Sequence, residues 1–284
     1  MPKAKARVHG AISLVNAIAN KKGATLGISL KVEASVETIP GKGIIIQSKN
    51  KTLSSRLINK TIEKIVSKKE LEQNKIIVTL ESEIPTGYGL KSSSAISSAV
   101  ALACSKLFKP NMTDQQILLA GVDASIESKV SITGAYDDAC SCYYGGFNVT
   151  DNSKKRIIHS EKIPSNLTAI IFVPKNRKRG NVKNLKTLSS VFDNAWKLAK
   201  NQNYWEAMII NGLATSTILN SDPSIITRLL DKGALAASVS GNGPAIAAIV
   251  KKGKESEIKK VFSSLEGIVI VSKVNNKKAE VHEL

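Results

Sequence analysis

The segment from Pro85 to Ala95 combines two glycines with three consecutive serines and runs into a small, apolar stretch that predicts a helix. A glycine-containing loop that opens a helix presents free backbone N–H groups and the positive end of the helix dipole. Gly87 and Gly89 permit a close approach that a Cβ would block, and the serine hydroxyls could donate to phosphate oxygens or ligate Mg²⁺. We therefore predict an anion-binding loop. It is not a Walker A loop, because no stretch of the chain reads GxxxxGK[ST].

Three acidic residues, Glu127, Asp137 and Asp138, follow this loop in the sequence. Carboxylates are ligands that Mg²⁺ prefers, and a carboxylate beside an acceptor hydroxyl can orient it or take its proton. One acid for the metal and one as base suffice for phosphoryl transfer. The alternative places Glu127 on a helix surface and the Asp pair in a turn or at a helix start. Three acids after an anion-binding loop favour the catalytic interpretation.

The net charge of +18 raises nucleic-acid binding as a second hypothesis, because clustered Lys and Arg release counterions from a polyanion. The cations are spread along the chain, however, and aromatic residues make up only 4%, too few for a base-stacking platform. We therefore expect no nucleic-acid partner. One exception is the segment 175–180, which carries four cations after an apolar run and could meet an anionic small molecule.

The remaining composition excludes several other classes of protein. Three cysteines without a CxxC pair and three scattered histidines predict neither a disulfide framework nor a structural zinc site. The chain contains no apolar run of the length that a membrane span needs, and its N-terminus lacks a secretory signal pattern. We expect a cytoplasmic enzyme without a membrane partner, and the sequence does not indicate its oligomeric state.

The elements that position these residues alternate between strand and helix, which predicts an α+β fold. The 284 residues suggest two domains, and a polar composition break places them at 1–152 and 153–284. We expect strands 28–36 and 44–46 to form a hairpin or meander and Thr113 with Gln116 to form a capping box. The other predicted elements are helices 52–68, 96–107, 113–128, 184–200, 203–220 and 223–232, and strands 75–84, 167–173, 234–239, 245–250 and 269–272.

In their order and spacing these segments resemble the three motifs of the GHMP kinases, the family of galactokinase, homoserine kinase and mevalonate kinase. The family's phosphate loop reads approximately P-x-x-x-G-L-G-S-S-A, and Pro85–Ala95 is similar to it, with Lys91 in place of the third glycine and one additional serine. The segment 240–244 resembles the third motif, and the resemblance implies that the first motif falls in 6–19. The resemblance covers nearly the whole chain and implies a two-domain fold, with an N-terminal domain like domain 2 of ribosomal protein S5 and a C-terminal ferredoxin-like domain.

The resemblance also implies roles for the acids. Glu127 precedes Asp138 by eleven residues, which is the spacing between the metal carboxylate and the catalytic aspartate in the mevalonate kinase branch. Asp138 precedes Gly145 by seven residues, again as in the family, and we favour Asp138 as the base. Counting from Gly134, as galactokinases space theirs, selects Asp137 instead, so both aspartates stay candidates.

Within the family, the segment Thr-Gly-Ala-Tyr-Asp-Asp-Ala at 133–139 resembles the archaeal shikimate kinases. This implies ATP-dependent phosphorylation of the 3-hydroxyl of shikimate, a step in chorismate and aromatic amino-acid biosynthesis, with Mg²⁺ bound. A family member that acts on another small hydroxyl substrate, of the homoserine or mevalonate type, is the alternative.

The complete site prediction has four parts. Asp138 or Asp137 is the base, and Glu127 with Ser93 or Ser94 holds the metal. Asn16 could hydrogen-bond a substrate hydroxyl. A substrate carboxylate could be bound by Arg177, Arg179, Lys178 or the segment 7–9, all candidates on charge alone, of which Arg177 and Arg179 are carried into the site prediction. The residues expected to bind ATP are Pro85, Thr86, Gly87, Tyr88, Gly89, Leu90, Lys91, Ser92, Ser93, Ser94, Ala95, Gly241 and Gly243.

Overall fold

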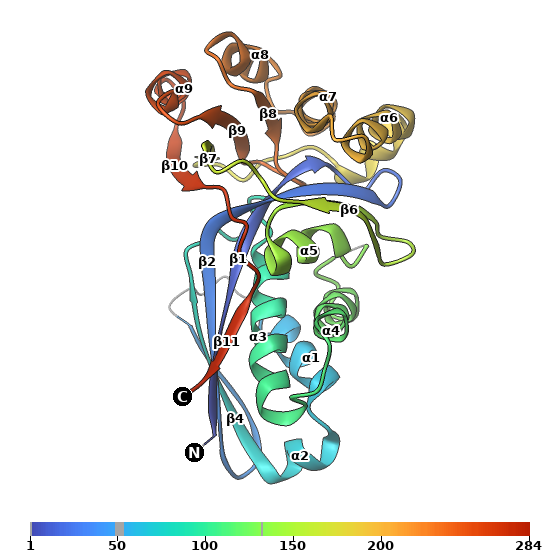
Figure 1. The fold of residues 1–284 in the computed structure, drawn as a ribbon, viewed down its shortest axis with the longest axis vertical. Coiled ribbons are helices and arrows are strands. Elements are labelled where there is room, and N and C mark those ends of the chain that lie inside the picture. The colour runs from blue at the N-terminus through green and yellow to red at the C-terminus, as the bar shows by residue number, and fades with distance from the viewer. Residues whose placement is uncertain (1, 49–53, 132) are drawn as a thin grey trace.

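The computed structural model describes residues 2–48, 54–131 and 133–284, which form two β-sheets with helices packed on each (Figure 1). In the first sheet the strands follow the order β11-β1-β2-β4-β3, and β5 pairs with β2 and with β6. Its strands are β1 (Lys3–Val15), β2 (Lys22–Pro40), β3 (Gly43–Ser48), β4 (Asn74–Ser82), β5 (Phe147–Asp151), β6 (Arg156–Glu161) and β11 (Glu280–Glu283).

The helices of this first unit lie to one side of the long strands in Figure 1. The capping box predicted for α4 is confirmed, because the Thr113 hydroxyl accepts from the Gln116 backbone and the Gln116 side chain accepts from the Thr113 backbone. The helices are α1 (Ser55–Ile65), α2 (Lys68–Gln73), α3 (Ser92–Phe108), α4 (Asp114–Glu127) and α5 (Tyr136–Tyr144).

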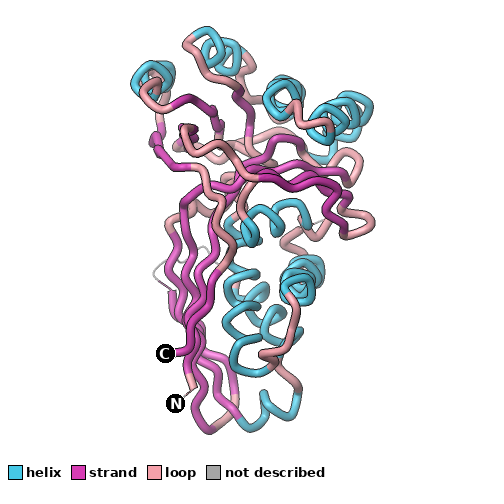
Figure 2. The backbone as a smooth tube through the Cα atoms, in the orientation of Figure 1, coloured by secondary structure: helices cyan, strands magenta, loops and turns pink. Residues whose placement is uncertain are grey.

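The second sheet is antiparallel, in the order β10-β7-β9-β8, and its helices form an outer layer at the top of Figures 1 and 2. Within the described residues, no helix combines the length and apolar character needed to cross a membrane. The elements are β7 (Leu167–Pro174), the 3-10 helix η1 (Val182–Leu188), α6 (Ser189–Lys200), α7 (Tyr204–Ile218), α8 (Ser224–Asp231), β8 (Ala236–Val239), β9 (Ile246–Lys251), α9 (Glu255–Phe262) and β10 (Gly267–Lys273).

The topology bears on two predictions, the pairing of the strands at 28–36 and 44–46 and the domain boundary after residue 152. The predicted pairing of β2 with β3 in a hairpin or meander is wrong. The chain returns through α1 and α2, and β4 then lies between β2 and β3, antiparallel to β2 and parallel to β3. The predicted division at residue 152 falls in the turn between β5 and β6. Both of these strands belong to the first sheet, and β11 returns to it from the far end of the chain.

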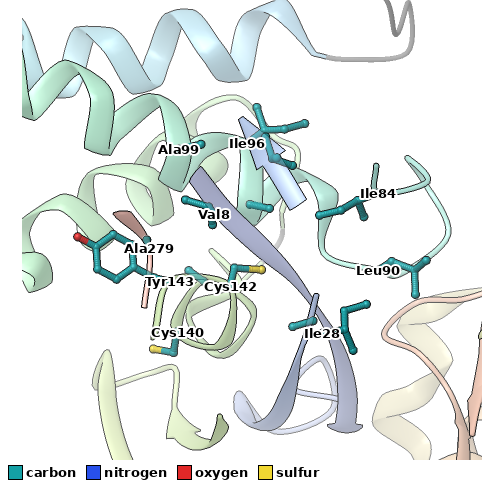
Figure 3. Close-up of a cluster of buried hydrophobic side chains, with 14 of the residues drawn as sticks. Val8, Ile28, Ile84, Leu90, Ile96, Ala99, Cys140, Cys142, Tyr143 and Ala279 are labelled. Carbon is teal, nitrogen blue, oxygen red and sulfur yellow. The ribbon is translucent and has the colours of Figure 1, made fainter. Parts of the chain in front are cut away.

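One apolar core holds the two segments that carry the predicted chemistry (Figure 3). Ile84 and Leu90 flank the glycine loop and are buried in the same cluster as Cys140, Cys142 and Tyr143 of α5. Burial raises the pKa of both thiols well above the ordinary value, so they pack as apolar side chains rather than as nucleophiles. The loop and α5 are therefore fixed relative to each other by packing.

Candidate active site

A cavity of about 340 Å³ opens where the end of β1 and the starts of α3 and α5 meet the loop between β8 and β9. Segments from both units of the fold contribute to its wall. The lining residues are Ser13, Asn16, Ala17, Ile18, Gly87, Gly89, Lys91, Ser92, Ser93, Ser94, Ser125, Val130, Ser131, Thr133, Ala135, Asp137, Asp138, Arg179, Val182, Gly241 and Asn242.

The first turn of α3 forms one wall of this cavity. The N-cap residue, Lys91, makes no capping hydrogen bond with its side chain, so the first N–H groups of the helix remain available to an anion. Gly89 brings the preceding loop against the second domain, because it has φ +84° and a Cβ there would lie 1.9 Å from the Ser240 carbonyl oxygen. The Ser240 hydroxyl in turn donates to the Gly89 carbonyl at 2.9 Å. The wall has the geometry of a phosphate cradle.

Asp138 faces this wall from the first turn of α5. Its Oδ1 lies 2.7 Å from the Nζ of Lys91, and the side chains of the two residues are only 18% and 5% exposed. The same ammonium donates to the Ser13 hydroxyl at 2.8 Å. The ion pair with Lys91 therefore holds Asp138 at the cavity wall. This arrangement suits a carboxylate that accepts a proton.

Asp137 has a different environment, although it also borders the cavity. Its Oδ1 accepts from the Asn152 amide at 2.7 Å. Its Oδ2 packs so closely against Gly23 that a Cβ added to this glycine would lie only 2.2 Å from it. Burial, and then the charge of Asp138, raise the pKa of Asp137. Asp137 is thus held against the backbone of β2, whereas Asp138 faces Lys91.

Asn16 lines the cavity, but its amide is engaged within the protein. Its Oδ1 accepts from the Ile18 backbone at 2.9 Å, and its Nδ2 donates to the Gly241 carbonyl at 2.8 Å. Its backbone N–H donates to the Asn211 side chain at 2.8 Å. Through these bonds Asn16 connects the end of β1 to the second domain. They give no support to the predicted contact with a substrate hydroxyl.

The two arginines predicted to bind a substrate carboxylate lie in different places. Arg179 borders the cavity and donates from Nη1 to the Asn242 carbonyl at 3.0 Å. Arg177 is absent from the lining and lies instead over the ring of Tyr88, 4.9 Å from its centroid. Of the two, Arg179 is therefore placed to meet a ligand in the cavity.

Glu127 is not brought into the cavity. It ends α4 with an exposed side chain whose carboxylate pairs with Lys64, while its backbone carbonyl accepts from Arg56. Among the described residues, no cluster of three or more His, Cys, Asp or Glu is arranged to hold a metal. The metal role predicted for Glu127 thus lacks support from the geometry, because the spacing of eleven residues fixes chain length and not the direction of the side chain.

The predicted nucleotide loop divides into residues that reach the cavity and residues that support it. Leu90 and Ala95 are buried in the core, and Tyr88 carries Arg177 on its ring. The predicted residues in the lining are Gly87, Gly89, Lys91, Ser92, Ser93, Ser94 and Gly241, and those outside it are Pro85, Thr86, Tyr88, Leu90, Ala95 and Gly243.

Sequence reasoning missed Ser13, Asn152 and Thr133 as parts of the site. Ser13 interrupts the apolar run of β1, and a polar residue in such a strand is a signal that could have found it. Asn152 lies just beyond β5 and acts on Asp137 across the fold, so nothing local to its sequence marks it. Thr133 stands in the segment already singled out for its aspartates.

Comparison with known proteins finds relatives over nearly the whole chain. Residues 56–146 match the family profile described as the GHMP kinases N terminal domain. The shikimate kinase of Methanothermobacter thermautotrophicus is 34% identical, covering 99% of each chain, and that of Methanosarcina acetivorans is 36% identical, covering 95% of this chain and 93% of its own. The crystal structure of homoserine kinase from Cytophaga hutchinsonii has a TM-score of 0.76 at 21% identity, covering 98% of this chain and 97% of that one.

The chain therefore belongs to the GHMP kinase family. Its two sheets form the two-domain α+β fold of that family, as the sequence motifs predict. Family membership makes it an ATP-dependent kinase of small molecules.

Proposed function

We propose that this GHMP kinase is a shikimate kinase, which transfers the γ-phosphoryl group of ATP to the 3-hydroxyl of shikimate in chorismate and aromatic amino-acid biosynthesis. The observation that carries the proposal is the pairing of two features across one cavity, the uncapped start of α3 and the carboxylate of Asp138. The choice of acceptor rests on full-length relatives named shikimate kinase at 34% and 36% identity.

In the proposed mechanism the triphosphate lies against the glycine loop and the first N–H groups of α3. These donors are fixed before ATP arrives, so they neutralise charge without reorganising. Asp138 accepts the proton of the acceptor hydroxyl as that oxygen bonds to the γ-phosphorus and ADP leaves. Asp137, packed against Gly23, orients the start of α5.

The cavity also offers donors suited to Mg²⁺. The hydroxyls of Ser93 and Ser94 and the carboxylate of Asp138 all border it, and hydroxyl and carboxylate oxygens are the ligands this ion takes beside phosphates. Bound Mg²⁺ would neutralise phosphate charge. Glu127 could join these ligands only by leaving Lys64.

Arg179 is the proposed partner of the acceptor's carboxylate. It borders the cavity, and a guanidinium can bind a carboxylate through two parallel hydrogen bonds. Homoserine and mevalonate also carry carboxylates, so this charge does not choose among the three acceptors.

The test is ADP release from the purified protein with Mg-ATP and shikimate, homoserine, mevalonate or no acceptor. Release that depends on shikimate alone is expected. Release with another acceptor would keep the kinase and refute the choice of substrate. In an Arg179→Met variant the KM for shikimate should rise about tenfold, because a charged hydrogen bond to the carboxylate is lost, while the KM for ATP should change little.

A further inference from the structure

Lys91 has a backbone conformation that its residue type disfavours. Its φ of +65° and ψ of +24° are in the left-handed region, where a residue with a Cβ is less stable than glycine. The resembling family motif has glycine at this position, and nothing in the backbone requires a lysine. The side chain must therefore supply the reason for this residue.

The Lys91 side chain carries its charge into the protein rather than to solvent, being only 5% exposed. A buried ammonium is stable only with partners, and two are present, Asp138 Oδ1 at 2.7 Å and Ser13 Oγ at 2.8 Å. On a further side it meets Gly241, where an added Cβ would lie 2.8 Å from Nζ. The ammonium is thus fixed by β1, α5 and the loop of the second domain.

The charges around the cavity make this pair distinctive. Of the described residues that line it, the charged ones are Lys91, Arg179, Asp137 and Asp138. Arg179 is engaged with the 242–243 carbonyls, and Asp137 is held by Asn152. Lys91 is therefore the cation that pairs with Asp138.

We propose that Lys91 is a positioning residue for Asp138, holding its carboxylate in one orientation for proton acceptance. This rests on the proposed function and assigns Lys91 a role in the acceptor half of the reaction, apart from the phosphate contacts expected of its loop. During transfer the acceptor O–H bond breaks and its proton passes to Asp138, while the new O–P bond forms and the bond to ADP breaks. Lys91 keeps its own proton throughout.

The test is a double-mutant cycle on shikimate-dependent turnover, with Lys91→Met, Asp138→Asn and the double variant. Lys91→Met is expected to lower kcat about 100-fold with the KM for ATP changed less than about threefold, because misplacement of a reacting group costs rate rather than binding. In the Asp138→Asn background the same change should lower kcat by no more than about threefold further, since the carboxylate through which Lys91 acts is gone.

Two further variants separate this role from folding. Lys91→Gly relieves the left-handed backbone and so offsets part of the stability lost with the buried ion pair; this variant should still unfold in one cooperative thermal transition while its kcat falls. Lys91→Arg, which keeps a cation near Asp138, should recover part of the lost kcat. Lys155→Met is the matched control, because it removes an exposed lysine that pairs with Asp123 at 2.6 Å, and its turnover should match the wild type.

Each alternative result overturns the proposal. Independent effects, in which the double variant shows the product of the two single losses, would mean that Lys91 acts on ATP rather than through Asp138. Loss of folding in Lys91→Gly, or full activity in Lys91→Met, would leave a structural role or none. A wild-type enzyme inactive with every acceptor would instead refute the proposed function, and the assignment of Lys91 with it.

Discussion

Two ion pairs in this protein join a lysine to a carboxylate, but one is buried in the cavity and the other lies on the surface. Lys91 and Asp138 meet in the cavity with side chains 5% and 18% exposed, whereas Lys64 and Glu127 meet on the surface, 32% and 45% exposed. Water screens the second pair, so it contributes only about 0–1 kcal/mol, while the first interacts across a poorly solvated site. Burial, and not the type of ion pair, decides which acid can be tuned for chemistry.

The helix ends reinforce this difference. Asp138 stands in the first turn of α5, where the helix dipole favours a negative charge. Glu127 stands in the last turn of α4, where the dipole opposes one. Lys64 offsets that unfavourable position, so the surface pair is explained by local electrostatics and requires no catalytic role.

The largest expected effect is on Asp138. Asp138→Asn keeps the size of the side chain but removes the proton acceptor, and kcat should fall by about 1000-fold, within the range for a general base. ATP affinity, measured by titration calorimetry, should change little. An equal loss in Glu127→Gln would break the comparison, because it would show that the surface acid serves the reaction too.

A smaller effect is expected for Asp137→Asn, since this carboxyl faces Gly23 rather than Lys91. Turnover should fall by less than about tenfold, because the change leaves the base in place. Its raised pKa means that ionising Asp137 destabilises the fold, and the amide removes that cost. The variant should therefore gain thermal stability over the wild type as pH rises from about 4 to 8. A loss as large as that of Asp138→Asn would transfer the base to Asp137.

Glu127→Gln should change kcat by less than about threefold and the free energy of unfolding by about 0.5 kcal/mol, as expected for an exposed ion pair. Lys64→Met is its matched partner and should behave alike. Turnover of both is measured across a Mg²⁺ titration. A raised Mg²⁺ requirement in Glu127→Gln alone would return this residue to the metal ligands predicted from its spacing.

The smallest expected effect is the change in the coupling energies of the two ion pairs with salt concentration. The coupling energy between Lys64 and Glu127, from a double-mutant cycle on thermal unfolding, should vanish between about 0.05 and 1 M NaCl, because mobile ions screen exposed charges. The coupling between Lys91 and Asp138 should persist over the same range. Equal salt dependence would mean that solvent reaches both pairs alike.

The sequence predicts local structure well where the signal is local. The capping box at Thr113 and Gln116 marks the start of α4. The helix predicted at 96–107 is also present, although α3 begins four residues earlier, at Ser92. Which strands pair in a sheet depends on contacts between residues far apart in the sequence. The position of β4 between β2 and β3 was therefore not predicted.

The site shows the same division. Spacing selects two adjacent aspartates, and both border the cavity. Adjacent helix residues point in different directions, however, and only packing against Gly23 shows which of the two turns toward the core. Spacing likewise selects Glu127 without giving the direction of its side chain, which Lys64 attracts outward. The role of Lys91 depends on Ser13, which is distant in sequence, and therefore required the folded structure.

The return of β11 to the first sheet has a consequence for synthesis on the ribosome. Residues 280–283 pair with residues 4–7 of β1, so this edge of the sheet lacks its neighbour until the second domain has been translated (Figure 1). An unpaired strand edge is open to association with other chains. The nascent first domain should accordingly be a client for chaperones until β11 emerges and covers it.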